Sequence, residues 1–304
     1  MSFSSDVKTE LTDIACAACC ETQLSRALLL FGRACSGVSL SLLTEHAGAA
    51  AAYAKAVALF SGVTPEISRS ESGNYKIQVE DPDVLDAVMG ELGETRNEKR
   101  QLCIGRIDRD CCVAAFLRGA FLAAGTVTNP DVEYHLEFSC PSTHLAKELI
   151  ALLEQTGIEA KCTKRGGVNI VYIKKSESIE TLLTLMGATE NSLLLMGAKM
   201  YKDVRNTVNR RVNFENANIA RSAAAARRQT EAIETLRRTG KFDELPPELR
   251  ELAALRLENP ESSTAELVEM LGDALTVSGV NHRFGRIIKA AAGDPAAQKK
   301  EGGA

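Results

Sequence analysis

The first half of the chain passes twice through the same order of secondary-structure elements, and this repetition restricts the possible folds more than any other feature. Hydrophobic periodicity and turn residues predict one copy over residues 20–92 and a second over 110–187. Matched elements lie about 93 residues apart, and the two hairpins, which turn at Gly73 and Gly166, align best. Chance likeness between two α/β segments is the alternative. If the copies are real, they form a saddle of two antiparallel sheets whose leading helices meet on a pseudo-twofold axis.

Each copy is predicted to contain three helices and three strands. The expected elements of the first copy are a helix at 22–33, a strand at 38–44, a helix at 46–60, strands at 66–70 and 75–80, and a helix at 82–91. Those of the second copy are a helix at 110–124, a strand at 133–139, a helix at 142–155, strands at 159–164 and 168–174, and a helix at 176–186. The expected fold class is therefore α+β for this part.

The leading helix of each copy has small residues along one face. Leu117 to Gly125 (LRGAFLAAG) resembles the helix of LAGLIDADG homing endonucleases, and a weaker copy lies at Leu24 to Gly32. Glycine and alanine on one face allow two helix backbones to pack closely. An ordinary amphipathic core helix is the alternative for either string alone. Together with the repeat, the resemblance implies a LAGLIDADG-like domain over residues 1–188.

The resemblance also implies where nuclease chemistry would lie, because a carboxylate before the last glycine of each helix holds a divalent ion in those enzymes. These positions are Ala124 and Phe31 here, or Ser36 if the first copy is aligned on Gly37. None of these side chains supplies the carboxylate that Mg²⁺ requires. We therefore expect no catalytic residue, metal or cofactor. The alternative is a divergent nuclease that uses other carboxylates: Asp108, Asp110 and Asp131.

Residues 241–293 predict an all-α domain of three short helices. We expect them at 248–257, at 264–271 with Ser263 or Thr264 as the cap, and from Thr276 to about 291. One apolar stripe on the third helix is expected to pack on the other two; it consists of Val277, Val280, Phe284 and Ile287, facing Leu252, Leu255, Leu267 and Leu271. Helix, turn and cationic helix are typical of a helix-turn-helix that binds duplex DNA.

The face opposite that stripe carries the residues expected to contact DNA, within about 263–293. Ser278, Asn281 and His282 are the expected base readers, because the first turn of such a helix meets base edges. Asn suits adenine and Arg suits guanine. Arg286 and Lys289 lie further along and are expected at phosphates. A solvated helix face is the alternative for this set, which is completed by Arg283, and His282 could also be a capping or core residue.

The segment between the two parts is basic. Residues 199–241 contain eleven Lys or Arg and four acids, a local charge of +7 in a chain whose net charge is −4. We expect a basic helical linker over 189–240, with its helix at 216–238, and a disordered tail at 294–304. A solvated linker surface is the alternative to phosphate contact for the secondary candidates, Arg205, Arg210, Arg211, Arg221, Arg227 and Arg228.

Nine cysteines, an odd number, argue against a disulfide framework. The start of the chain lacks the pattern of a secretory signal, and no apolar run is long enough to cross a membrane. We expect a cytoplasmic, nucleoid-associated protein with reduced thiols that fill small core spaces. The alternative is a zinc site formed by Cys16, Cys19 and Cys20 together with Cys111 and Cys112.

The order of parts and several long strings resemble the bacterial WhiA family over essentially the whole chain. The strings are MSFSSDVKTEL at the start, then LRGAFLAAGTVTNP, YHLEF, DVRNTVNRRVNFENANIARS and SGVNHRFGRI. The first repeat departs most from the family pattern. The resemblance implies a DNA-binding transcription regulator of Gram-positive bacteria, linked to sporulation in some relatives and to cell division and chromosome segregation in others, with a carboxyl-terminal part similar to the promoter-reading region of sigma factors.

The partner implied is double-stranded DNA, with a regulatory or division protein bound at the saddle as a second partner and no membrane. A scaffold of the division machinery with incidental DNA binding is the alternative function.

Overall fold

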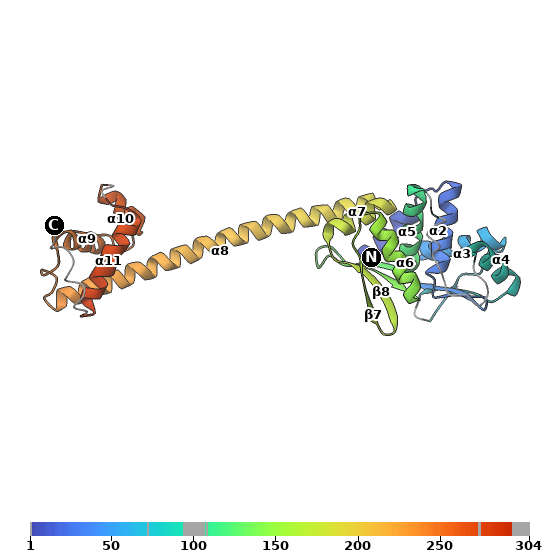
Figure 1. The fold of residues 1–304 in the computed structure, drawn as a ribbon, viewed down its shortest axis with the longest axis horizontal. Coiled ribbons are helices and arrows are strands. Elements are labelled where there is room, and N and C mark those ends of the chain that lie inside the picture. The colour runs from blue at the N-terminus through green and yellow to red at the C-terminus, as the bar shows by residue number, and fades with distance from the viewer. Residues whose placement is uncertain (1, 72, 94–106, 108, 273–274, 294–304) are drawn as a thin grey trace. The chain divides into compact units, whose positions relative to one another are not determined.

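The computed structural model describes residues 2–71, 73–93, 107, 109–272 and 275–293 (Figure 1). The chain divides into two compact units, Met1–Asp203 and Val204–Ala304. Asp108 and the expected tail at 294–304 lie outside the described residues. The two units are described in turn.

The first unit contains two copies of one order of elements, preceded by the helix α1 (Phe3–Thr12). The first copy consists of α2 (Ala18–Leu30), β1 (Ala34–Cys35), β2 (Leu40–Thr44), α3 (Ala47–Ser61), β3 (Ser68–Arg69), β4 (Tyr75–Val79) and α4 (Pro82–Leu92). The second consists of α5 (Asp110–Ala124), β5 (Gly125–Val127), β6 (Leu136–Cys140), α6 (Thr143–Gln155), β7 (Lys161–Arg165), β8 (Val168–Ile173) and α7 (Ser176–Met186).

Each copy forms a four-stranded antiparallel sheet. The strand orders are β1-β2-β4-β3 and β5-β6-β8-β7, so equivalent strands occupy equivalent places in the two sheets. The registers place Leu42 opposite Ile77 in the first sheet and Phe138 opposite Val171 in the second. All four side chains are buried, because period-two alternation turns every second residue towards the helices. The duplication predicted from the sequence is confirmed.

The structure differs from the prediction at the shortest elements. The strands β1 and β5 and the helix α1 were not predicted. Strands of two and three residues are too short to show alternation. The helix α1 begins after Ser2, whose hydroxyl accepts a hydrogen bond from the Ser5 backbone N–H, and it buries only Val7 and Leu11. The strand expected at 133–139 begins later, at Leu136.

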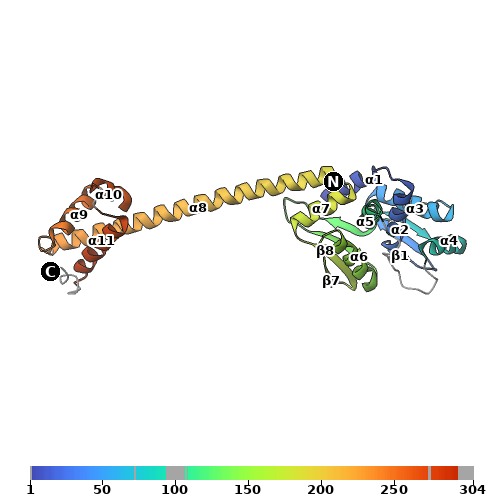
Figure 2. The ribbon, with the colours of Figure 1, turned by 45° about the horizontal axis from the view of Figure 1, so that its top comes forward.

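The leading helices α2 and α5 lie side by side at the centre of the first unit (Figure 2). Gly119 of α5 faces α2 so closely that a Cβ atom there would overlap the Leu24 carbonyl oxygen and lie 2.9 Å from the Ala27 Cβ. Phe31 and Phe116 pack edge to face across the same contact, with ring centroids 6.3 Å apart. The small residues thus allow the backbone approach that the sequence predicted.

The basic segment forms one helix, α8 (Thr189–Arg238), far longer than the 216–238 predicted. The Glu10 carboxylate caps its first turn, accepting hydrogen bonds from the backbone N–H groups of Glu190 at 2.7 Å and Asn191 at 3.1 Å. Residues 198–238 contain no glycine or proline, so nothing in the sequence interrupts the helix. Its asparagines, which usually favour turns, are outnumbered by helix-forming residues.

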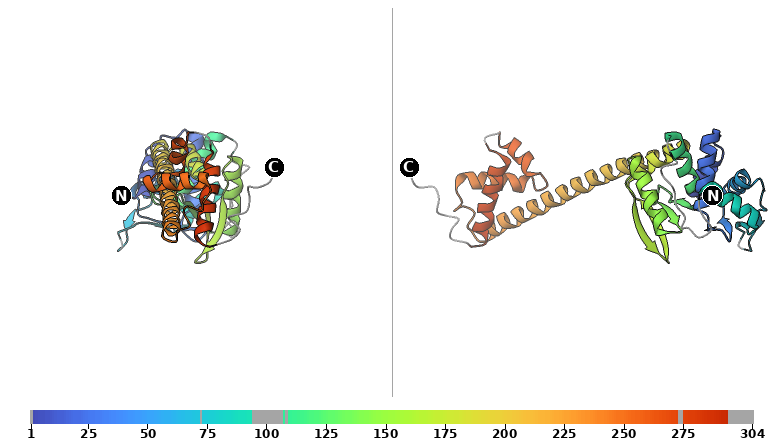
Figure 3. Two further views of the ribbon diagram at one scale, coloured as in Figure 1. Left: turned by 90° about the vertical axis from the view of Figure 1, so that its left-hand side faces the viewer. Right: turned by 45° about the vertical axis from the view of Figure 1, so that its right-hand side comes forward.

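The second unit contains α9 (Pro247–Glu258), α10 (Thr264–Met270) and α11 (Val277–Ala291), which pack with the carboxyl-terminal end of α8 (Figure 3). Ile233 and Leu236 of α8 are buried among these helices. The linker expected at 189–240 therefore ends inside the core of this unit. None of the described helices combines the length and apolar composition needed to span a membrane.

Candidate nucleic-acid interface

Local capping interactions set the directions of the last three helices. Pro247 occupies the first turn of α9, and Asn259, which precedes Pro260, ends it. Ser263 and Glu266 form a capping box at α10: the Glu266 backbone N–H donates to the Ser263 hydroxyl at 3.2 Å, and the Ser263 N–H donates to the Glu266 carboxylate at 2.6 Å. The Thr276 hydroxyl caps α11, accepting from the Gly279 N–H at 3.2 Å.

The apolar face of α11 fixes which side of the helix is exposed. Val280, Phe284 and Ile287 are fully or almost fully buried against Leu252 and Leu267. Leu255 and Leu271 are partly buried beside them, as predicted. The prediction for Val277 was wrong, because its side chain is 44% exposed. It is the first residue of the helix, and the buried face starts one turn later.

The opposite face of α11 presents the residues predicted to contact bases. Ser278, Asn281 and His282 are exposed there. With about 3.6 residues per turn, Ser278 and His282 lie opposite the buried stripe, whereas Asn281 lies on one flank. The Asn281 side-chain carbonyl accepts a weak hydrogen bond from the Thr264 hydroxyl at 3.4 Å, which ties this flank to the first turn of α10.

The cations of α11 occupy two positions on this face. Lys289 is exposed and shares the central line with Ser278 and His282. Arg283 and Arg286 are half-buried on the other flank. The Arg286 guanidinium lies 3.7 Å from the Glu248 carboxylate of α9, so in this structure it forms an ion pair rather than standing free for phosphate. The helix itself contains no acid.

A buried arginine that no sequence pattern predicts joins several parts of this unit. Arg256 of α9 is 1% exposed. It donates to the Gln229 side-chain oxygen at 3.0 Å and to the carbonyl oxygens of Asn259 at 3.1 Å and Ser262 at 2.5 Å. Its guanidinium also lies 5.3 Å from the centre of the Phe284 ring. Burial lowers the pKa of Arg256. One side chain therefore links α8, the turn between α9 and α10, and α11.

The six arginines of α8 named as secondary contacts are all exposed. Arg211 pairs with Glu215 at 2.9 Å and Arg227 with Glu231 at 3.3 Å. Arg221 donates to the Asn218 side-chain oxygen at 2.5 Å. Within the described part of the chain, the side chains of the other three form no ion pair: Arg205, Arg210 and Arg228.

The carboxyl-terminal ends of α2 and α5, where the homing-endonuclease resemblance would place metal ligands, border a cavity in the first unit. Ala124 and Phe31 line it, and among the lining residues that the structure describes Glu45 supplies the one carboxylate. Lys8 lies beside Glu45; burial lowers its pKa to about 8, while the carboxylate opposes that shift. A lone carboxylate next to a lysine does not provide the paired oxygen ligands that a hard divalent cation needs.

The carboxylates of the alternative nuclease hypothesis lie elsewhere. Asp110 is the first residue of α5 and Ala124 the last, about 21 Å apart at the helical rise per residue. Asp131 is exposed in the turn after β5, where its backbone N–H donates to the Asn129 side chain at 2.8 Å. Among the described residues these two carboxylates do not converge at the helix ends.

Comparison with known proteins identifies both units. Residues 113–205 match the family model for the WhiA LAGLIDADG-like domain, and residues 208–291 match that for the WhiA C-terminal HTH domain. The Oceanobacillus iheyensis protein named "Probable cell division protein WhiA" is 34% identical, over 94% of this chain and 96% of that one. A Heliobacterium modesticaldum protein of the same name is 36% identical, over 94% and 95%.

The likeness extends to a solved structure. The crystal structure of full-length DUF199/WhiA from Thermotoga maritima matches 96% of this chain and 98% of its own, with a TM-score of 0.59 and 25% sequence identity. The first unit is thus a degenerate LAGLIDADG-like domain, and the second is a helix-turn-helix domain. The chain belongs to the WhiA family.

Proposed function

We propose that this chain is a non-enzymatic DNA-binding regulator of transcription, which acts in cell division and the associated chromosome segregation or sporulation. The observation that carries the proposal is the polar side of α11, which has Lys289 opposite a fully buried stripe, Arg283 and Arg286 on one flank, and no acid. A helix held in this way presents one polar face to a major groove. The relatives are named probable cell division proteins, and these names support a role in cell division.

In this proposal the first two turns of α11 read bases and the later part holds the backbone. Ser278, Asn281 and His282 reach base edges, and a bidentate contact from Asn281 suits adenine. Lys289 neutralises a phosphate and carries no sequence information. Arg286 exchanges the Glu248 carboxylate for a phosphate when DNA binds. The ion pair is partly exposed, so breaking it costs little free energy.

The test is a change in DNA affinity. Replacing Asn281 and Lys289 together with alanine should weaken binding at least about ten-fold, because a base contact is worth roughly 1–3 kcal/mol and a phosphate contact is lost as well. Fluorescence anisotropy on a duplex selected from a random pool by the unaltered protein measures the change. Lys147→Ala, which removes an exposed cation from α6, is the matched control and should leave affinity unchanged. Equal affinity of the double variant and the control would contradict the proposal.

The exposed arginines of α8 give a separate prediction about salt dependence. If Arg210 and Arg228 each neutralise a phosphate, replacing both with alanine should reduce the log–log slope of affinity against salt by about 1.8. Arg211 and Arg227 already pair with acids, so the corresponding double variant should change the slope less. An unchanged slope in both variants would mean that this surface is only solvated.

The absence of nuclease activity is tested on the same protein. Supercoiled plasmid incubated with the chain and Mg²⁺ or Mn²⁺ should remain intact, since the described residues at the helix ends offer no carboxylate pair. Metal-dependent nicking that disappears in Asp110→Ala would overturn the non-enzymatic part of the proposal.

A further inference from the structure

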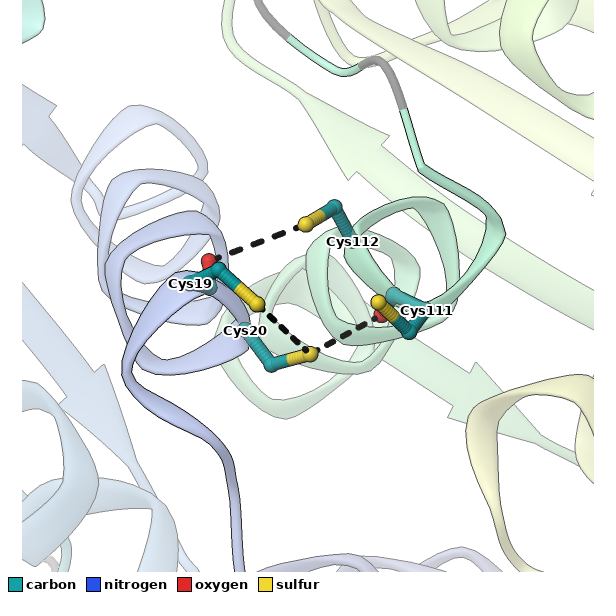
Figure 4. Close-up of side chains that lie close together, drawn as sticks. All are labelled: Cys19, Cys20, Cys111 and Cys112. Atoms are coloured by element: carbon teal, nitrogen blue, oxygen red, sulfur yellow. Dashed lines mark hydrogen bonds between the residues drawn. The ribbon is translucent and has the colours of Figure 1, made fainter.

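Four cysteine side chains meet where α2 and α5 begin. Cys19 and Cys20 lie in the first turn of α2, and Cys111 and Cys112 occupy the equivalent positions of α5. Figure 4 shows the side chains of Cys19 and Cys20 directed from α2 towards α5, and that of Cys112 directed back towards α2. All four sulfur atoms lie within 4.8 Å of one another. The duplicated fold thus brings together two vicinal pairs that are far apart in the sequence.

The spacing of these sulfur atoms suits a tetrahedral metal ion. Zinc–sulfur bonds of about 2.3 Å place the sulfur atoms of a Cys₄ site about 3.8 Å apart. The Cys19 and Cys20 sulfur atoms are 3.9 Å apart. The widest separation in the group exceeds the tetrahedral edge by only about 1 Å, which small side-chain rotations can supply. Rearrangement of the helices is not required.

The two helix ends also help to hold thiolate ligands once a cation is bound. The four residues lie at the amino-terminal ends of two helices, where the helix dipoles stabilise negative charge. The thiols of Cys20 and Cys112 form only weak contacts with backbone oxygen, at 3.5 Å to Cys111 and 3.8 Å to Cys19. The exposed Cys19 and Cys111 leave an entry path for an ion, whereas Cys112 is buried.

We propose that Cys19, Cys20, Cys111 and Cys112 form a zinc site that clips the two repeats together. Four sulfur ligands select soft or borderline cations, and zinc needs no redox partner. The sequence favoured reduced thiols that fill the core, but that reading does not explain why two pairs from different repeats converge. A disulfide would use two of the four sulfur atoms and leave the other two without a role. Cys16 is outside the site, because its sulfur accepts a hydrogen bond from Arg118 at 3.4 Å.

Binding at this site is coupled to folding and to proton release. Zinc binds cysteine as the thiolate, so an ion that enters the site displaces the protons of the thiols that it binds. The ion joins the amino-terminal ends of the two central helices, whereas the cavity at their carboxyl-terminal ends carries no such ligand set. The role of the bound ion is therefore structural, because four cysteine ligands leave no coordination position open for a substrate.

The experiment uses the full-length chain, purified under reducing conditions. Elemental analysis should find about one zinc per chain. After removal of zinc by a chelator, titration with Co²⁺ should produce thiolate-to-cobalt charge-transfer bands and the visible bands of a tetrahedral ion, and zinc should then displace the cobalt. Zinc should also raise the Tm of the first unit by several degrees, because it binds only the folded state.

Variants separate this site from the other thiols. The double variant Cys20→Ser/Cys112→Ser should abolish the cobalt bands. Cys19→Ser alters an exposed side chain and should leave the circular dichroism spectrum unchanged. This variant should nevertheless bind the metal at least ten-fold more weakly. Cys16→Ser and Cys162→Ser should bind one metal ion like the unaltered chain. The proposal is overturned if the unaltered reduced chain shows no cobalt–thiolate bands. It is equally overturned if Cys19→Ser binds as tightly as the control variants, or if mass spectrometry finds a disulfide within the group instead of metal.

Discussion

Gly119→Ala is expected to lower the free energy of unfolding of the first unit by about 2 kcal/mol. A Cβ atom at this position would overlap the Leu24 carbonyl oxygen, which belongs to the backbone of α2 and cannot rotate away. Alanine has a helix propensity about 1 kcal/mol better than glycine, but inserting atoms into a tight helix contact typically costs 1–3 kcal/mol or more when the backbone must move. Urea unfolding followed by circular dichroism measures the net loss.

Gly90→Ala is the matched control for this prediction. Gly90 lies in α4 with nothing near its missing Cβ, so the substitution should stabilise the unit by about 0.5–1 kcal/mol through propensity alone. Opposite signs for the two variants are therefore expected. If Gly119→Ala were also stabilising, the close packing of α2 on α5 would have to be abandoned.

Arg256→Met is expected to destabilise the helix-turn-helix unit by about 3 kcal/mol and to weaken DNA binding as α11 loses its support. Methionine fills much of the same volume but leaves two oxygen acceptors without a donor, the Ser262 carbonyl and the Gln229 side chain, while the Asn259 carbonyl keeps only the Ser262 N–H. Each hydrogen bond to a charged group contributes about 1.5–3 kcal/mol, offset in part by the desolvation of the guanidinium. Thermal unfolding of the full chain, with hydrogen exchange to localise the effect, measures it.

Two further variants bracket the Arg256 result. Arg256→Lys should recover only part of the loss, because an ammonium group lacks the planar fork that reaches the Gln229 oxygen and both carbonyls at once. Arg228→Met removes an exposed arginine from α8 and should change stability by less than about 0.5 kcal/mol. If Arg228→Met and Arg256→Met lowered stability by similar amounts, the buried contacts of Arg256 would contribute nothing to the stability of the unit.

The sequence predicted the helices and strands whose hydrophobic patterns extend over five or more residues, and it missed the shortest strands. The hairpins around Gly73 and Gly166 were placed within a few residues, because alternation over five or six positions is a strong signal. The strand β1, two residues long, gives no alternation. The helix α8 was predicted at less than half its length, because its middle lacks a continuous buried stripe and asparagine usually indicates turns.

The features of the candidate interface that belong to one helix could be predicted from the sequence, whereas those that depend on contacts between several helices could not. The exposed face of α11 follows from its own sequence, because Val280, Phe284 and Ile287 define the opposite side. Arg256 resembles any surface arginine in the sequence, and its burial depends on α8, the turn after α9 and α11 packing around it. The pairing of Arg286 with Glu248 likewise joins residues 38 positions apart. Contacts of this kind depend on tertiary packing, which local periodicity does not encode.

The burial of Ile233 and Leu236 at the end of α8 determines how the carboxyl-terminal part can be isolated. A fragment cut at residue 241, where the sequence suggests a boundary, would remove Ile233 and Leu236 from the core that they share with Leu252 and Phe284, and would remove Gln229 from Arg256. Such a fragment would aggregate or unfold and would give a false negative in a gel-shift assay. A fragment that begins before Ala226 keeps Ile233, Leu236 and the hydrogen bond of Gln229, and should stay folded for studies of recognition.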